Sequence, residues 1–272
     1  MHWVIQDDPR ERGLWFLAEH LPRWGIPHSL HTVVPIIGQI VPDISPVGNV
    51  IVIGSYSMRH VAREKGWVPG CFDVGHLQHE DFLVAWKRHM LNADCVVCSL
   101  QDAPHYFRDP SFARPASDTK AFPAKVYGRE EFMEWRDKVQ RMVDTAKPDE
   151  RLDVTMGTRL VISPPRDISQ ETRCWIVDRK LVTASVYRRY ETVIHDSDVD
   201  EDVRAFAQSM AEQAWQPHRA YVLDVGRVGD ELKVVEVNTL NSAGFYAADM
   251  QKLVEAIESM EFRPNCPTAS SG

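Results

Sequence analysis

The chain has 272 residues, of which 44% are hydrophobic and 26% are charged, and its formal net charge is −8. This composition is that of a globular protein large enough to bury a core, and it excludes a disordered or fibrous chain. The acidic balance argues against general nucleic-acid binding, which needs many cations to neutralise phosphates. The charge is uneven, because residues 111–190 carry a net +4 and residues 191–272 a net −9. A basic segment followed by an acidic one could place a polyanion beside its metal ions.

The compartment can be judged from what the chain lacks. It has no run of 18 or more apolar residues, so we expect no membrane span. Its first eight residues lack the basic start and apolar stretch of a secretory signal. Its five cysteines are odd in number and widely scattered, which suits a reducing compartment. We therefore expect a cytoplasmic protein.

Strands and helices are expected to alternate over roughly the first 105 residues. Apolar runs predict strands at residues 2–6, 31–34, 50–54 and 95–98, and helical spacing predicts helices at 10–23, 57–65 and 81–91. The β-branched run of residues 50–53 is typical of a buried parallel strand. This alternation predicts a small α/β domain at residues 1–109.

Residues 102–123 are rich in proline, aspartate and serine, so we place a domain boundary near residues 108–112. The elements expected beyond it are strands at residues 125–127, 152–163, 173–190 (with a turn at 178–180), 220–225 and 232–237, and helices at 129–143, 200–215 and 247–260. The sequence thus predicts a second domain at residues 110–262 and a frayed tail at residues 263–272.

The most informative segment is an acidic strand pair. The strands flank a turn at Gly229 and Asp230, so we expect them to pair antiparallel. Glu236 and Asn238 are two residues apart and share a face, and Asp224 can lie opposite them on the partner strand. Three converging oxygen donors would suit Mg²⁺. The alternative is that these are exposed polar positions of a half-buried hairpin.

This Asp…Glu-x-Asn hairpin, followed by the small-residue loop of residues 239–246, resembles the metal-binding end of the ATP-grasp superfamily. The resemblance covers roughly residues 110–262. It implies an α/β (α+β) ATP-grasp fold preceded by a small α/β domain. It also implies that Asp224, Glu236 and Asn238 hold Mg²⁺ ions that bridge the phosphates of ATP.

The same resemblance implies cations upstream that contact the phosphates. Most family members carry a lysine before a proline at the end of a strand, and Arg114 stands in that place here, before Pro115. The segment is thus similar to a clade, frequent in bacteria and phages, in which arginine replaces that lysine. Residues 117–120 would form the loop that closes over the phosphates, with Lys120 as a second cation. The alternative is an ordinary surface loop with basic residues.

A second basic segment is similar to the family's Glu-x-Arg strand. Arg173 would contact the phosphates or the substrate, and Glu171 would orient it from the same strand face. The alternative is a surface ion pair worth about 0–1 kcal/mol. Family members often have an arginine two residues before the metal-binding aspartate, but this chain has Val222 there. We therefore expect Arg188 to stabilise the tetrahedral intermediate or to contact an anionic substrate.

The segment of residues 160–165 would be the hinge beside adenine. The resemblance implies that its backbone reads the base and that Val161 and Ile162 pack on it. Ser163 and two prolines follow, in place of the acidic residue with which many members hold the ribose.

The function implied is an ATP- and Mg²⁺-dependent carboxylate–amine ligase that works through an acyl phosphate, with a small-molecule or peptide carboxylate and an amine as substrates. The alternatives are a kinase with the same fold that phosphorylates a hydroxyl, and a nucleotide-binding module without turnover. The sequence identifies neither substrate, nor the oligomeric state.

Three other patterns are more simply explained by structure. Cys95 and Cys98 have redox-motif spacing but lie on an apolar strand, which favours buried thiols. His76, His79 and Glu80 form a weak metal pattern in an expected loop. The acidic run of residues 196–202 lacks the glycine and glutamate of a calcium loop and is typical of a solvated turn before a helix.

Overall fold

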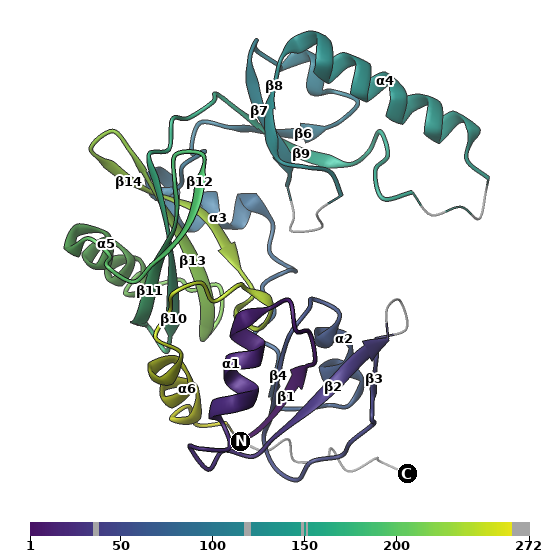
Figure 1. Cartoon of the computed structure of the whole chain (residues 1–272). Coiled ribbons are helices and arrows are strands. Elements are labelled where there is room, and N and C mark those ends of the chain that lie inside the picture. Colours follow the sequence, from purple (N-terminus) through teal and green to yellow (C-terminus); the bar gives the residue numbers. More distant parts are fainter. Residues whose placement is uncertain (35–37, 117–120, 148–149, 151, 263–272) are drawn as a thin grey trace. The chain divides into compact units, whose positions relative to one another are not determined.

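The structure is a computed structural model that describes residues 1–34, 38–116, 121–147, 150 and 152–262 (Figure 1). Lys120 and the tail of residues 263–272 lie outside the described residues. The chain contacts divide it into two compact units. Unit 1 comprises residues 1–74, 170–225 and 236–272, and unit 2 comprises residues 75–169 and 226–235. Each unit is described by itself.

The N-terminal part of unit 1 is a five-stranded sheet with the strand order β3-β2-β1-β4-β5. Its elements are β1 (His2–Gln6), α1 (Arg12–His20), β2 (His28–Val34), β3 (Gln39–Val41), β4 (Val50–Ile53), α2 (Met58–Glu64) and β5 (Pro69–Gly70). β1 pairs in parallel with both β2 and β4, and β3 is an antiparallel edge strand. All four residues of β4 are buried, which confirms the buried parallel strand expected there.

A second sheet has the order β12-β11-β10-β13-β14. Its elements are β10 (Gln170–Val177), β11 (Lys180–Arg189), β12 (Thr192–Asp196), α5 (Glu201–Ala211), β13 (Ala220–Val228), β14 (Glu231–Asn238) and, after a 3₁₀ turn at Leu240–Ser242, α6 (Met250–Glu258). Asp178 and Arg179 join β10 to β11 with positive φ angles of 42° and 65°. Such a pair matches the right-handed twist of a hairpin. Gly229 (φ 56°) and Asp230 join β13 to β14, as expected.

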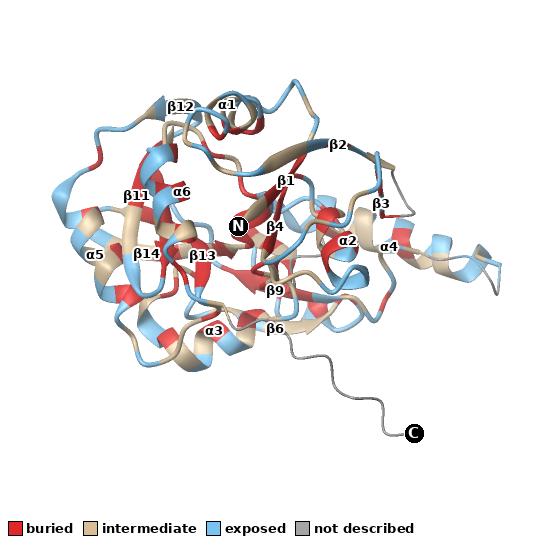
Figure 2. Cartoon of the chain, turned by 90° about the horizontal axis from the view of Figure 1, so that it is seen from below, coloured by how far each residue is buried: buried red, intermediate tan, exposed pale blue. Residues whose placement is uncertain are grey.

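The largest hydrophobic core of unit 1 joins these two sheets. It contains Trp3 and Ile51 from the N-terminal sheet together with Trp175, Val222 and Leu253 from the second sheet and α6. Each fully buried large apolar side chain stabilises the fold by about 1.5–3 kcal/mol. The ribbons of β1, β4 and β13 are almost entirely buried (Figure 2). These contacts therefore group residues 1–74 with part of the segment 110–262, which differs from the linear division at 109.

Unit 2 contains a four-stranded antiparallel sheet with the order β6-β9-β7-β8. Its elements are α3 (His79–Trp86) with a 3₁₀ turn at Lys87–His89, β6 (Val96–Ser99), a 3₁₀ turn at Ala103–His105, β7 (Ser111–Pro115), β8 (Lys125–Tyr127), α4 (Arg129–Thr145) and β9 (Arg159–Ser163). The core under this sheet is aromatic, because Phe107 stacks on Phe132 at 4.4 Å between ring centroids.

Most expected elements are present, and the differences lie at ends and edges. The strand expected at residues 152–163 covers only Arg159–Ser163, and the helix expected at residues 81–91 ends at Trp86. The short strands β3, β5, β7 and β12 were not anticipated. No helix among the described residues is long and apolar enough to cross a membrane.

Candidate functional site

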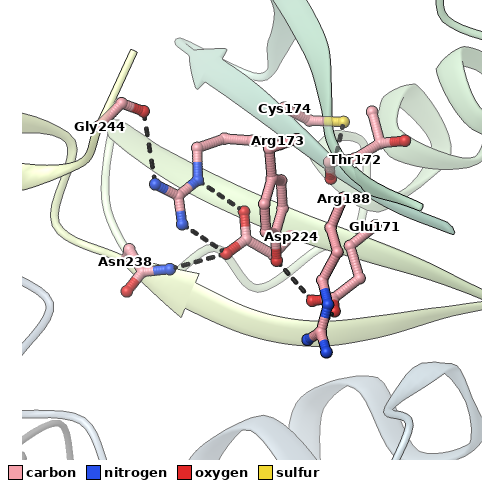
Figure 3. A network of polar contacts seen from close by, with 9 residues as sticks. Glu171, Thr172, Arg173, Cys174, Arg188, Asp224, Asn238 and Gly244 are labelled. Atoms are coloured by element: carbon pink, nitrogen blue, oxygen red, sulfur yellow. Dashed lines mark hydrogen bonds and ion pairs between the residues drawn. The ribbon is translucent and has the colours of Figure 1, made fainter. Parts of the chain in front are cut away.

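The centre of the site is the carboxylate of Asp224, which is 1% exposed. Arg173 on β10 donates to it through two parallel hydrogen bonds, Nε to Oδ1 and Nη2 to Oδ2, both 2.8 Å long (Figure 3). β10 and β13 are neighbours in the sheet, so their side chains on one face meet directly. A bidentate pair of this kind fixes both groups strongly.

The third expected metal ligand adjoins this pair. Asn238 on β14 donates from Nδ2 to Oδ2 of Asp224 over 3.1 Å. Glu236 lies on the same strand and is partly exposed, whereas the intervening Val237 is buried. The alternation of faces along β14 is the one expected from the sequence.

Arg173 lies against two aromatic rings. Its guanidinium carbon is 5.2 Å from the ring centroids of both Tyr187 and Tyr246, which stack on each other at 5.1 Å. Its Nη1 also donates to the carbonyl oxygen of Gly244. Burial alone would lower the pKa of Arg173, but its hydrogen bonds to Asp224 outweigh burial and raise the pKa above the ordinary value. Arg173 is therefore a permanent, oriented cation.

Glu171 has a different role from the one expected. It accepts hydrogen bonds from the hydroxyl of Tyr187 (2.5 Å) and from Nη1 of Arg188 (2.9 Å), and it is Asp224 that orients Arg173. The physical reason is a register shift between Glu171 and Thr172, which interrupts the strict alternation along β10. Arg188 is 40% exposed and pairs with the buried carboxylate of Glu171.

The donor set fits a hard divalent cation. Oδ2 of Asp224 accepts two hydrogen bonds and Oδ1 accepts one, so within the described residues Oδ1 retains a lone pair for a metal ion. No group of three or more His, Cys, Asp and Glu side chains that could hold a metal is found in the described part of the chain. The set predicted here has two carboxylates and an amide, which leaves room for phosphate oxygens and water, as Mg²⁺ prefers.

A pocket of about 190 Å³ adjoins this cluster at Gly244. It lies beyond the carboxyl ends of the parallel strands β1 and β4, with Gln6, Asp8, Ser55 and Asn241 in its walls. Ligands commonly bind at this edge of α/β sheets. A Cβ on Gly54 would lie 2.5 Å from the Cβ of Gln6, so glycine is needed at this wall.

The remaining expected contacts lie in unit 2. Arg114 is on β7, one residue before the end of that strand, and its Nη2 is 2.8 Å from Nδ1 of His79. Val161 and Ile162 are buried on β9, and both edges of β9 are paired, with β6 and with β7. Their main-chain groups therefore belong to the sheet. This corrects the expectation that the backbone of these two residues reads adenine, and leaves their side chains as the contact proposed.

Two aromatic residues of the cluster were missed by the sequence analysis. Tyr187 and Tyr246 contact Arg173 but were given no role. The spacing of Arg173 and Tyr187 across the turn at residues 178–179 could have suggested that they lie near each other on paired strands. Nothing in the sequence placed Tyr246, whose loop position has a φ of 48°.

Comparisons with solved structures show what this fold resembles. A RimK domain ATP-grasp protein from Sphaerobacter thermophilus DSM 20745 matches with a TM-score of 0.58 at 15% identity, over 89% of this chain and 92% of that chain. The D-cycloserine synthetase DcsG matches with 0.59 at 15%, over 94% and 99%. A D-alanine–D-alanine ligase from Bacillus anthracis complexed with ATP matches with 0.56 at 14%, over 95% and 92%.

Among curated proteins, no sequence relative was found. The model of one ATP-grasp domain family, the third family of its clade, matches residues 57–257, which is most of the chain. That range contains Arg114, Arg173, Asp224, Glu236 and Asn238. The chain therefore belongs to the ATP-grasp superfamily, as a member of that ATP-grasp domain family.

Proposed function

We propose that this protein is an ATP- and Mg²⁺-dependent ligase that joins a carboxylate to an amine. The observation that carries the proposal is the buried Asp224 carboxylate, bonded by Arg173 and Asn238 in a chain of the ATP-grasp superfamily. Two of the solved structures with this fold are named as a ligase and a synthetase, which supports the same class of reaction.

The proposed reaction has two steps. The substrate carboxylate attacks the γ-phosphorus of ATP, the bond to the β,γ-bridging oxygen breaks, and ADP leaves with an acyl phosphate formed. The amine then attacks the acyl carbon, inorganic phosphate leaves, and the nitrogen loses a proton to give the amide. Both steps move negative charge and depend on positioning and charge neutralisation more than on covalent help.

Each predicted side chain has a place in this scheme. Asp224, Glu236 and Asn238 would hold Mg²⁺, which would neutralise and orient the phosphate oxygens. Arg173, already aligned by Asp224, presents a fixed cation. Arg114, in the position where most family members have lysine, and Lys120 would contact the phosphates, and Val161 and Ile162 would line the adenine site.

Arg188 is the proposed contact for an anionic substrate or for the tetrahedral intermediate. Its ion pair with Glu171 and its 40% exposure leave it oriented but accessible. We expect the carboxylate or the amine to occupy the pocket at Gly244, because that pocket adjoins Arg173 through the Gly244 carbonyl.

The test is a Glu236→Ala variant, assayed for ADP formation with ATP, Mg²⁺ and a panel of carboxylates and amines. We expect loss of Mg-ATP binding or turnover with the fold intact, because the change removes a metal ligand and not a core side chain. Glu231→Ala is the matched control, since it lies on the same strand and its side chain is 72% exposed. Full activity of Glu236→Ala would overturn the metal assignment.

The same assay separates the alternatives. ADP formation that requires both a carboxylate and an amine supports the ligase. ADP formation with a stable phosphoester product would identify a kinase. Nucleotide binding without any turnover would identify a binding module.

A further inference from the structure

A histidine in unit 2 contacts the proposed phosphate-binding arginine directly. His79 is the first residue of α3 and is 2% exposed. Its Nδ1 lies 2.8 Å from Nη2 of Arg114. The sequence pattern around residues 76–80 suggested an exposed loop, but the structure buries this imidazole against the guanidinium.

Main-chain hydrogen bonds fix the position of His79 relative to Arg114. The backbone N–H of His79 donates to the carbonyl of Ala116, two residues beyond Arg114 (3.0 Å), and Ala116 in turn donates to the carbonyl of Arg159 on β9 (3.1 Å). Gln78 and Asp81 form a capping box at the start of α3, which sets the direction of its first turn. The imidazole is therefore held beside β7 by the backbone and not by its own side-chain bond alone.

The chemistry of the pair determines the state of the imidazole. A guanidinium only donates hydrogen bonds, so Nδ1 of His79 must accept and the ring proton lies on Nε2. Burial, followed by the charge of Arg114, lowers the pKa of His79 to about 4. At neutral pH the ring is uncharged and in a single tautomer.

A neutral acceptor orients an arginine differently from a carboxylate. Asp224 fixes Arg173 with two charged hydrogen bonds, and the opposite charge offsets that of the guanidinium. His79 fixes one N–H of Arg114 without adding a negative charge. The guanidinium is thereby directed while its attraction for an anion is kept.

We propose that His79 is a positioning residue that aims Arg114 at the phosphates of the nucleotide. This rests on the proposed function, in which Arg114 contacts those phosphates. His79 itself acts through Arg114.

The test compares nucleotide affinity among three variants, measured by calorimetry with AMP-PNP and Mg²⁺. In His79→Asn the side-chain Oδ1 takes the place of Nδ1 and accepts from Arg114, whereas His79→Ala offers no acceptor. We expect His79→Ala to weaken binding about tenfold, the loss of one charge-assisted hydrogen bond, and His79→Asn to stay within about threefold of the wild type. The partly exposed His76, changed to alanine, is the matched control and should bind as the wild type does.

Two further measurements exclude a merely structural effect. The ¹⁵N shifts of the His79 ring should show an unprotonated Nδ1 and a protonated Nε2 at pH 7. In an Arg114→Ala background, adding His79→Ala should cost no further affinity. Unfolding curves of each variant identify a loss of fold.

Three results would overturn the proposal: wild-type affinity in His79→Ala, affinity in His79→Asn as weak as in His79→Ala, or the opposite tautomer. If the wild type itself binds no nucleotide, the proposed function fails and this inference fails with it. Wild-type binding combined with an unaffected His79→Ala variant overturns the inference alone.

Discussion

In this structure Asp224 is neutralised by the guanidinium of Arg173, in the place where the proposed reaction needs a divalent cation. The two cations need not exclude each other, because Oδ1 keeps a lone pair among the described contacts. A carboxylate with 2% of its side chain exposed requires a positive partner at all times. Arg173 supplies that partner in the protein alone.

The first prediction concerns this pair. Arg173→Met should lower the free energy of unfolding by about 3–5 kcal/mol, because it leaves a buried carboxylate without its cation. The measurement is urea unfolding at pH 7. The double variant Arg173→Met/Asp224→Asn should recover part of the loss, since the uncompensated charge is gone. Strictly additive effects of the two changes would contradict this account.

The second prediction concerns pH and His79. Its pKa of about 4 in the folded protein is below the ordinary value of 6.5, so the unfolded chain binds more protons between these values. The contribution to stability is therefore complete above about pH 6.5 and is lost as the pH falls toward 4, by up to about 3 kcal/mol. Unfolding free energies measured from pH 4 to 7 should fall more steeply in the wild type than in His79→Asn, and parallel curves would be the contrary result.

At the scale of single residues, the sequence predicted partners within one sheet better than partners across the fold. Asp224, Asn238 and Arg173 lie together because strand alternation and a tight turn bring them together, and both are readable from the sequence. His79 and Arg114 are 35 positions apart and meet through main-chain bonds between a helix start and a strand end. No periodicity reports such a contact.

At the scale of elements, the β10–β11 hairpin shows where pattern reasoning stops. Its turn and both strands agree with the sequence expectation, but the register shift after Glu171 directs that carboxylate to Tyr187 and Arg188. A bulge inserts or removes one residue from the pairing and leaves no mark on the hydrophobic pattern of a strand buried on both faces. The partner of Glu171 therefore had to come from the structure.

The third prediction belongs to α6. Asp249 caps this helix by accepting a hydrogen bond from the backbone N–H of Lys252 (3.1 Å). Asp249→Ala should cost about 1 kcal/mol at pH 7, and Asp249→Asn, which keeps an acceptor, should cost less. The cap bond lowers the pKa of Asp249, so the difference between Asp249→Ala and the wild type should shrink as the pH falls through that lowered pKa. Thermal unfolding at pH 7 and in acid measures it, and a cost independent of pH would contradict the role of the charge.

At the scale of the whole molecule, the division into units is not the linear one. Composition indicated a boundary near residue 110, and the change in composition there is real. However, the core of unit 1 joins Trp3 and Ile51 to Trp175 and Leu253. Long-range packing of this kind follows from which apolar faces meet, and the order of elements along the chain does not determine it.

The fourth prediction measures nucleotide binding through global stability. A ligand that binds only the folded state raises the free energy of unfolding by about 2.7 kcal/mol at 100 times its dissociation constant. ATP with Mg²⁺ should therefore raise the melting temperature of the wild type and of Glu231→Ala, but not that of Glu236→Ala. An equal rise in all three proteins would show that Glu236 takes no part in binding.

The discontinuous core also has a consequence for the order of synthesis. Trp3 and Ile51 leave the ribosome long before Leu253 and Met260, which complete the same core. The N-terminal sheet must therefore wait with its apolar face uncovered, whereas the core of unit 2 draws only on residues between Cys98 and Ile162 and can close earlier. Nascent chains of increasing length should become resistant to protease first within residues 98–162, and only after α6 has emerged within residues 1–74.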